Sequence, residues 1–461
     1  MTRSAHTHAA RILLSLYLLE SAALLVLIGI YKAPAYDRTV LSTKAGTTLI
    51  VGGIGLIASG WLLIRRTRAS GPLRGRAVAL GLTTNLLSGL VAFLLFETTL
   101  RIVARRTPEG IVVGSVPVRP SWAELTARSR EVLTGVTTLG TWDKSYFVYD
   151  RELGWTVGSN RRSPNGLYFS SVEGIRSAGP NVRMADQTPR FRVALIGDSN
   201  AFSFEVPFAE SWGHHLQRLL GDDAQVLNFG VDGYGIDQVY LRYRRDVRPW
   251  KPQVAVIAFI GHDFWRTMAV YPFVSWGWLG YLVKPRFAIR NSELELLNVP
   301  LPTPDEILGA GRVQQLPFVE YDLGYATTEW CWRFDRGPLS LRFLTSAFPR
   351  RPLAVPQVSE EAAEALNSRL LIEIVKSMEQ AGTVPVFVFL PSSADALGRA
   401  TLLRSHVHTL DVTGCLAEVP PDRRRVPSGH HYTGLANQAI ARCTAPAVEL
   451  ALRKVGDPVK R

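Results

Sequence analysis

The stretch Arg192-Val-Ala-Leu-Ile-Gly-Asp-Ser-Asn200 decides the fold of this chain. Its aliphatic residues predict a buried β-strand, and the Gly-Asp-Ser that follows is typical of a turn. The pattern over residues 210–220 then predicts a helix. A strand, a tight turn and a helix in this order bring Ser199 to the carboxyl end of a buried strand, which is where open α/β sheets bind ligands. Because Gly-Asp-Ser is also ordinary turn chemistry, the rest of the chain must decide its meaning.

Strand and helix patterns alternate after Ser199. Further strands are predicted at 226–229, 254–260, 384–390 and 409–412, and helices at 236–247, 360–380 and 434–452. Alternating β and α segments with buried strands predict a parallel, doubly wound α/β sheet. Residues 270–345 are rich in Trp, Phe, Pro and Gly, and we expect them to form an irregular insertion.

The N-terminal part of the chain has a different character. Three apolar runs, at 12–31, 47–64 and 77–96, are each close to the ~20 residues that a helix needs to cross a membrane. A signal peptide explains one such run but not three in succession. The 461 residues are therefore expected to form a membrane domain with three transmembrane helices (1–104), a lead-in (105–190) and the α/β domain (191–461).

The loop between the second and third predicted spans contains five arginines and no acidic residue: Arg65, Arg66, Arg68, Arg74 and Arg76. Short basic loops stay in the cytoplasm, so the α/β domain is expected on the outer side of the membrane. The chain has 52 Lys and Arg against 39 Asp and Glu. These basic residues form no stripe interleaved with aromatic residues, so no nucleic-acid partner is predicted.

The three cysteines have no metal-ligand spacing. In an oxidising compartment, one disulfide can form, and Cys415 with Cys443 is the pair that we predict.

A serine nucleophile needs a base to take its proton. The candidate base lies in the loop before the last helix, where His430 and His431 are adjacent. Strand ends of one parallel sheet face the same crevice, so this loop can reach Ser199. Adjacent histidines also occur in metal sites and on surfaces. Neither cysteine nor carboxylate sits at ligand spacing here, so no metal site is predicted.

The nucleophile also needs donors for an oxyanion. Gly233 allows a backbone N–H to approach a ligand closely. His262, at the end of the strand over 254–260, offers a side-chain N–H. A helix or loop cap is the alternative role for His262.

Four blocks in this order resemble the GDSL/SGNH hydrolase superfamily. They are Gly197-Asp-Ser199, Asn228-Phe-Gly-Val-Asp-Gly233, Gly261-His-Asp263 and Gly429-His-His431. The resemblance runs from about Tyr149 to the end and includes Leu153-Gly-Trp155 and Lys284-Pro-Arg-Phe287, which look like those of membrane-anchored bacterial members. It implies a flavodoxin-like sheet and ester hydrolysis without a metal or organic cofactor. It also implies that Ser199 is the nucleophile, and that the N–H groups of Ser199 and Gly233 hold the oxyanion.

The chain departs from the family pattern at two positions. His262 stands where the family has Asn, and Ser428 stands where the family has Asp, three residues before the catalytic His. Motif position favours His431 over His430 as the base. The missing acid normally fixes the imidazole tautomer and stabilises the imidazolium. Ser428, a backbone carbonyl or a remote acid such as Asp411 are the candidates to replace it.

Together with the apolar runs, the resemblance implies an extracytoplasmic serine esterase anchored in a bacterial inner membrane, which acts on O-acyl esters of cell-envelope glycans or on small esters. A first alternative is an O-acyltransferase that modifies an extracytoplasmic polysaccharide, with a membrane acyltransferase as its partner. A second is a catalytically impaired glycan-binding or assembly partner, suggested by Ser428 and His262. The tryptophans of the insertion, such as Trp276 and Trp278, suit either sugar stacking or local packing.

Overall fold

A computed structural model of the chain describes residues 90, 93–107, 110–134, 146–323, 338–347, 359–392 and 395–456. The chain divides into two compact units. One consists of Met1–Ser121 with Thr328–Leu353, and the other of Trp122–Thr327 with Ala354–Arg461. The second unit contains the sheet, and every candidate site residue belongs to it.

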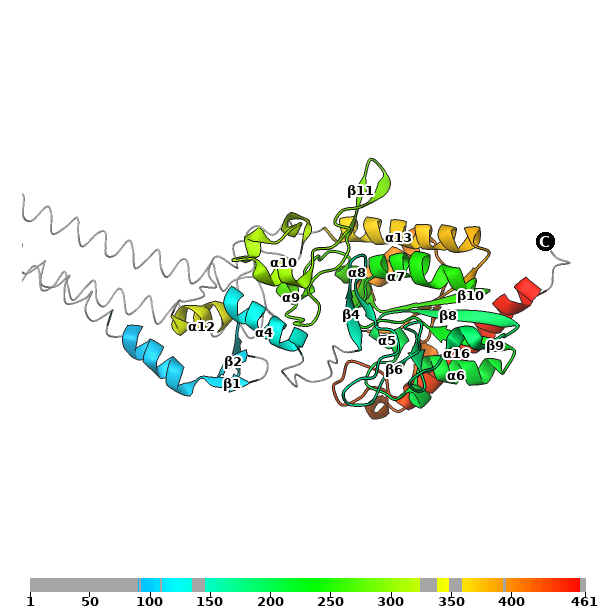
Figure 1. Ribbon diagram of the computed structural model, residues 1–461, viewed down its shortest axis with the longest axis horizontal. Helices are drawn as coiled ribbons and strands as arrows, with labels where there is room; N and C mark the ends of the chain where they lie inside the picture. Colours follow the sequence, from blue (N-terminus) through cyan, green and yellow to red (C-terminus); the bar gives the residue numbers. More distant parts are fainter. Residues whose placement is uncertain are drawn as a thin grey trace, which may run out of the picture. The chain divides into compact units, whose positions relative to one another are not determined.

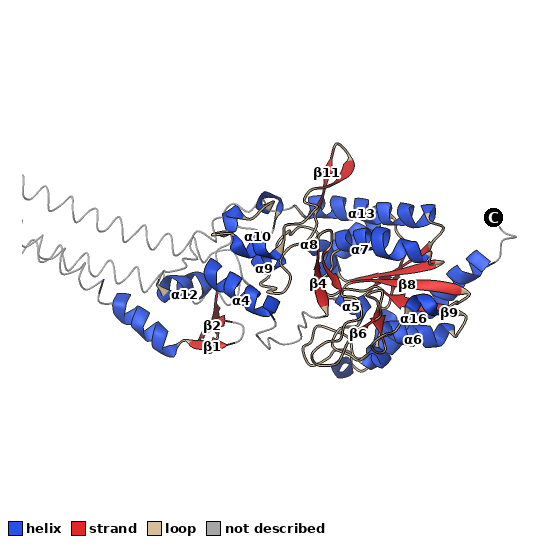
Figure 2. Cartoon of the chain, in the orientation of Figure 1, coloured by secondary structure: helices blue, strands red, loops and turns tan. Residues whose placement is uncertain are grey.

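The central sheet has five parallel strands in the order β14-β13-β10-β8-β9 (Figures 1 and 2). In chain order these are β8 (Phe191–Gly197), β9 (Ala224–Asn228), β10 (Val254–Phe259), β13 (Val384–Phe389) and β14 (Thr409–Asp411). This is the 2-1-3-4-5 order of flavodoxin-like folds, in which the chain reverses direction across the sheet between β8 and β10. The predicted parallel, doubly wound sheet is confirmed.

Alternate residues of each central strand face opposite sides of the sheet. Ile196 and Ile257 belong to one hydrophobic cluster, whereas Leu195 and Val256 belong to another. The helices α7 (Ile236–Arg242) and α13 (Glu360–Gln380) contribute to the first cluster. The helices α6 (Trp212–Leu220) and α16 (Gly434–Gly456) contribute to the second (Figure 1). Burial on both faces explains why the strands read as unbroken apolar runs.

Several helix boundaries differ from those predicted. A 3₁₀ turn at Phe208–Glu210 precedes α6, which starts after its cap, Ser211. The helix predicted over 236–247 becomes α7 followed by a π-helical turn at Tyr243–Val247. The sequence did not predict α5 (Ser199–Phe202), α8 (Gly261–Arg266) or α14 (Asp395–Ser405). The first two start at strand ends and are too short to show helical periodicity in the sequence.

The lead-in supplies small hairpins to the same unit. The strands β4 (Phe147–Asp150) and β5 (Gly154–Val157) pair antiparallel, as do β6 (Phe169–Ser170) and β7 (Arg176–Ser177). Trp155 stacks on Tyr281 with ring centroids 4.3 Å apart, and its Nε1–H donates to the Asp232 carbonyl at 2.8 Å. The hairpin therefore packs against the turn that follows β9.

The predicted insertion contains short regular elements. They are α9 (Pro272–Ser275), the hairpin β11 (Phe287–Arg290) and β12 (Glu293–Leu296), and α10 (Pro304–Gly309). The helix α4 (Trp122–Thr134), from the lead-in, belongs to the same unit. Its Trp122 Nε1–H donates to the Ala310 carbonyl at 2.7 Å, just after α10.

The other unit contains β1 (Arg105–Thr107), β2 (Gly110–Val113), β3 (Val116–Val118) and α12 (Leu339–Ala347). The buried Glu97 carboxylate accepts hydrogen bonds from the amides of Leu339 and Ser340 at 2.9 and 2.7 Å. These amides stand at the start of α12, whose first N–H groups have no partner within the helix. Glu97 thus joins α12 to the helical segment over residues 93–103.

Within the described stretches, no helix combines the length and apolar character needed to span a membrane. The predicted spans at 12–31 and 47–64 lie outside those stretches, as does most of the span at 77–96.

The predicted disulfide is confirmed. Cys415 and Cys443 are bonded, with Cα atoms 6.1 Å apart, and they join α15 (Thr413–Ala417) to α16. Cys331 lies outside the described residues.

Candidate active site

Ser199 lies at the carboxyl end of β8, as the first residue of α5. The chain passes from strand to helix through Gly197, where φ is +155° and an added Cβ would be 2.2 Å from the Ala258 carbonyl oxygen. Asp198 caps the short helix, because its carboxylate accepts from the Asn200 N–H at 2.8 Å. This turn fixes Ser199, only 3% exposed, at the wall of a cavity.

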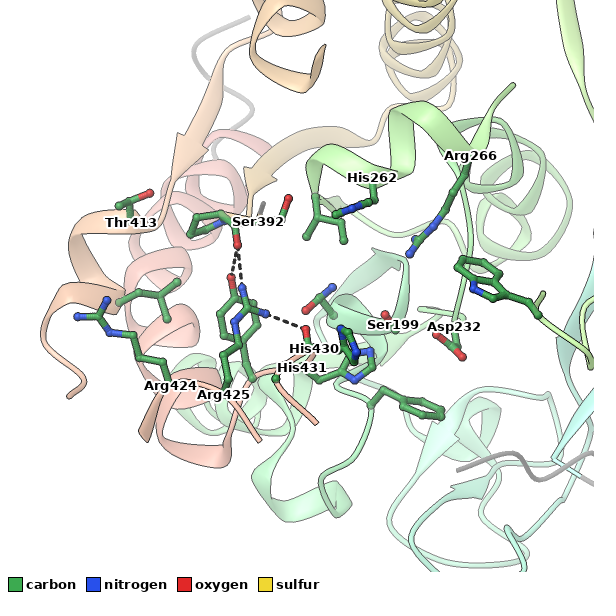
Figure 3. Close-up of a pocket in the computed structure, with 18 of the residues that line it drawn as sticks. Ser199, Asp232, His262, Arg266, Ser392, Thr413, Arg424, Arg425, His430 and His431 are labelled. Atoms are coloured by element: carbon green, nitrogen blue, oxygen red, sulfur yellow. Dashed lines mark hydrogen bonds between the residues drawn. The ribbon is translucent and has the colours of Figure 1, made fainter. Parts of the chain in front are cut away.

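The cavity has a volume of about 830 Å³ and is lined by residues that follow several strands of the sheet. It includes the side chains of Ser199, Asp232, His262, Arg266, His430 and His431 (Figure 3). The structure thus brings the predicted nucleophile, both candidate histidines and His262 to one cavity.

The His431 imidazole is hydrogen-bonded to a carboxylate that the sequence analysis missed. Its Nδ1 lies 2.5 Å from Glu205 Oε2, and the two side chains are 15% and 18% exposed. A carboxylate on Nδ1 fixes the tautomer and leaves Nε2 as the nitrogen that can act as base.

Glu205 corrects our expectation for the missing acid. Ser428 does not bind the ring nitrogen. Its hydroxyl donates to the same Glu205 oxygen at 2.6 Å. Asp411 accepts from the Thr413 N–H at 2.9 Å and pairs with Arg399 at 3.2 Å. Neither contacts the ring of His431, whose Nδ1 lies against a carboxylate from another segment of the chain.

A sharp bend in the chain after α5 brings Glu205 to His431. Ser203 and Glu205 both have positive φ, +62° and +65°, which is uncommon for residues other than glycine. The buried Arg176 donates to three carbonyls of this bend, those of Phe202, Ser203 and Val206.

The bend is held from a second direction by Tyr168, whose hydroxyl accepts from the Glu205 N–H at 2.7 Å. Burial lowers the pKa of Arg176 to about 10, so it remains a cation at neutral pH. Arg176 and Tyr168 come from the lead-in, so contacts remote in sequence set the position of the acid.

One sequence signal could have pointed to Glu205. Serine at position 428 leaves the role of the acid unfilled, and Glu205 is the first carboxylate after Ser199. Its six-residue distance from the nucleophile gives no indication of where the side chain points.

His430 is placed differently from His431. Its N–H donates to Ser428 Oγ at 3.3 Å, and its carbonyl accepts from Arg425 Nη1 at 2.9 Å. The residue is exposed. Among the described residues, His431 contacts a carboxylate and His430 does not, so the environment of His431 suits a base better.

The predicted oxyanion donors occupy two separate strand ends. Gly233 has φ +76°, and an added Cβ would lie 3.2–3.4 Å from the rings of Trp278, Tyr281 and Trp155. Any other residue would be strained by this backbone conformation and would crowd these rings. His262 lines the cavity from the start of α8. The capping interaction there is made by Asp263, which accepts from the Ile260 N–H at 3.0 Å.

Buried charges lie behind Ser199. Arg266 contacts the carboxylates of Asp198 and Asp263 at 3.3 and 2.5 Å, which secures the turn that carries the nucleophile. Burial raises the pKa of Asp232, although His431 and the Tyr281 hydroxyl act in the opposite direction. The Tyr281 hydroxyl donates to Asp232 Oδ2 at 2.7 Å.

No cluster of three or more His, Cys, Asp or Glu side chains suited to a metal ion is found in the described part of the chain.

The flavodoxin-like sheet thus brings a serine and a carboxylate-bound histidine to one cavity at the carboxyl ends of its strands, where folds of this class bind ligands.

No protein-family model matches the chain, and neither does any curated protein. The solved structures similar to it include TesA, with 12% identity over 56% of this chain and 99% of TesA, at a TM-score of 0.32. An acetylxylan esterase, Axe2 from Geobacillus stearothermophilus, has 13% identity over 59% of this chain and 97% of its own, at 0.30. A structure from Desulfitobacterium hafniense, described as a lipolytic protein of the G-D-S-L family, has 12% identity over 55% and 99%, at 0.28.

Proposed function

We propose that this chain is a membrane-anchored, extracytoplasmic esterase of the SGNH type, in which Ser199, His431 and Glu205 form the catalytic triad. One observation carries the proposal. His431, which shares the cavity with Ser199, has its Nδ1 bound to a carboxylate. This combination prepares an imidazole to accept a proton at Nε2.

In the proposed mechanism, His431 takes the proton of Ser199, whose oxygen attacks the ester carbonyl. The oxyanion is held by the N–H groups of Ser199 and Gly233 and by His262. His431 then gives its proton to the departing alcohol, which leaves an acyl-enzyme on Ser199. Water, activated by the same histidine, releases the carboxylic acid and restores the serine.

Glu205 weakens the alternative of a catalytically impaired binding partner. That alternative was suggested by serine at position 428, which left the histidine without an acid. Glu205 supplies a carboxylate at 2.5 Å from Nδ1, so the substitution at 428 does not by itself imply lost activity.

The proposed location rests on the apolar runs of the N-terminal sequence and on the arginine-rich loop between the second and third runs. The disulfide between Cys415 and Cys443 supports an oxidising compartment, because structural disulfides persist there and are rare in the cytosol. An acylated envelope glycan is the substrate that we propose for such a location. Trp278, which lines the cavity, offers a face for a sugar ring.

Fluorophosphonate labelling of the detergent-solubilised protein tests the proposal. Wild type is expected to be labelled, Ser199→Ala not at all, and His431→Ala much more slowly. Ser392→Ala and His430→Ala are matched controls, because both residues line the same cavity, and they are expected to keep labelling. A folded wild-type protein that is not labelled between pH 6 and 9 would contradict the proposal.

Product analysis separates hydrolysis from O-acyl transfer. Release of free acid that does not depend on an added glycan is the result expected of an esterase. Acyl glycan formed at the expense of free acid would instead show that a glycan hydroxyl replaces water as acceptor.

A further inference from the structure

In the part of the chain that the structure describes, the arginine side chain at one end of the cavity is paired with carboxylates, whereas the arginine side chains at the other end are not. Figure 3 shows Arg266 and Asp232 toward one end and Arg424 and Arg425 toward the other. Arg266 is compensated by the carboxylates of Asp198 and Asp263. Among the described residues, neither Arg424 nor Arg425 forms an ion pair with a carboxylate.

Both guanidinium groups donate hydrogen bonds to backbone carbonyls. Arg424 donates through Nε to Val419 at 2.7 Å and through Nη2 to Ala417 at 3.4 Å. Arg425 donates through Nη1 to His430 at 2.9 Å and through Nη2 to Pro391 at 2.8 Å. A carbonyl orients a guanidinium without neutralising it. Each group has five N–H donors, so these bonds leave further donors for a ligand.

The local structure holds both groups in place. The Arg425 guanidinium lies 3.8 Å from the centroid of the Tyr432 ring, and both arginines are half-buried. Ordering a long side chain in advance reduces the entropy that a ligand must overcome on binding. Planar guanidinium groups favour carboxylates and phosphates, which they can bind through two parallel hydrogen bonds.

We infer that the Arg424 and Arg425 end of the cavity is a subsite for an anionic group, a carboxylate or a phosphate, on the substrate whose ester is presented to Ser199. This inference rests on the proposed function, because it assumes that the cavity binds an ester for hydrolysis at Ser199. It narrows the substrate class from acylated glycans in general to acidic ones.

Arg423 provides a matched control. It precedes Arg424 in the chain but lines a different cavity, together with Glu210 and Asp422. Arg423→Gln therefore removes the same charge from the same loop without touching the proposed subsite.

Direct binding tests the subsite independently of catalysis. The full-length Ser199→Ala protein in detergent is titrated calorimetrically with oligogalacturonate, glucose 6-phosphate and a neutral xylo-oligosaccharide. At least one anionic probe is expected to bind about tenfold or more tightly than the neutral one, and to weaken with added KCl. Preference for oligogalacturonate identifies a carboxylate, and preference for glucose 6-phosphate identifies a phosphate.

The variants in the same background decide whether the arginines are responsible. Arg424→Gln is expected to weaken binding of the anionic probe by about tenfold, whereas Arg424→Lys weakens it less and Arg423→Gln by less than twofold. Arg425→Gln is the second test of the pair. Equal affinity for charged and neutral probes, or equal effects of the 423 and 424 variants, would overturn the inference.

The two proposals fail separately. If the protein is not labelled by fluorophosphonate but binds anionic probes selectively, the esterase proposal is rejected and the subsite proposal stands. If Ser199 is labelled but all probes bind with equal affinity, only the subsite proposal is rejected.

Discussion

Replacement of Glu205 by Gln is the sharpest test of the site. Gln has nearly the shape of Glu but carries no charge. Its amide can donate to His431 Nδ1, where the carboxylate accepts at 2.5 Å. An Nδ1 that accepts a hydrogen bond moves the ring proton to Nε2, and Nε2 then cannot take the proton of Ser199.

The size of the effect follows from the burial of the pair. With side chains 15% and 18% exposed, water cannot fully replace the carboxylate. Loss of a triad acid in such a site lowers kcat by about 10³–10⁴-fold, which corresponds to about 4–5.5 kcal/mol in the activation barrier. Ser428→Ala removes only a neutral donor to the same oxygen, so we expect at most about a tenfold loss.

The assay is hydrolysis of 4-nitrophenyl acetate between pH 6 and 9, with circular dichroism as a check on folding. The Glu205→Gln, Ser428→Asp double variant should recover part of the lost activity. Ser428 Oγ is 2.6 Å from Glu205 Oε2, so a carboxylate at position 428 stands close to His431. A folded Glu205→Gln protein that keeps kcat within tenfold of wild type would refute the triad.

Three other predictions concern stability. Arg176→Met should lower the free energy of unfolding by about 3 kcal/mol or more and also reduce activity, because three buried carbonyls lose their donor; a wild-type melting temperature for this variant would contradict the role of Arg176. Burial would raise the pKa of Asp150, but hydrogen bonds, of which the bond from Arg245 has the largest effect, lower the pKa below its usual value. The stability contributed by Asp150 is therefore present above its unfolded pKa and is lost as the pH falls below about 4. Denaturant titrations at several pH values should show that the free energy of unfolding falls less steeply in acid for Asp150→Asn than for wild type. If the two proteins lose stability in parallel, Asp150 is not a source of the acid dependence. Replacing Cys415 and Cys443 by Ala removes a cross-link between residues 28 positions apart, and should reduce stability by about 3–4 kcal/mol; unchanged denaturation midpoints would contradict this.

Much of the fold could be predicted from local sequence patterns. The aliphatic runs that became β8 and β10 are buried on both faces, so each run shows its strand character without any knowledge of its neighbours. The parallel order followed from the alternation of strands with helices such as α13, whose predicted bounds agree with those observed. Short helices such as α5 carry too few residues for a periodic signal.

Within the site, the sequence by itself predicted that Ser199 and a distant histidine loop share a cavity, because parallel strands end at one edge of the sheet. It also predicted the pairing of Cys415 with Cys443. Only the tertiary structure decided which acid serves His431, since Glu205 reaches the ring across 226 positions. That contact depends on a bend with positive φ, held by Arg176 from the lead-in. Residue types and spacing record which groups a chain contains, whereas the direction of a side chain at a bend is set by packing among segments that are distant in sequence.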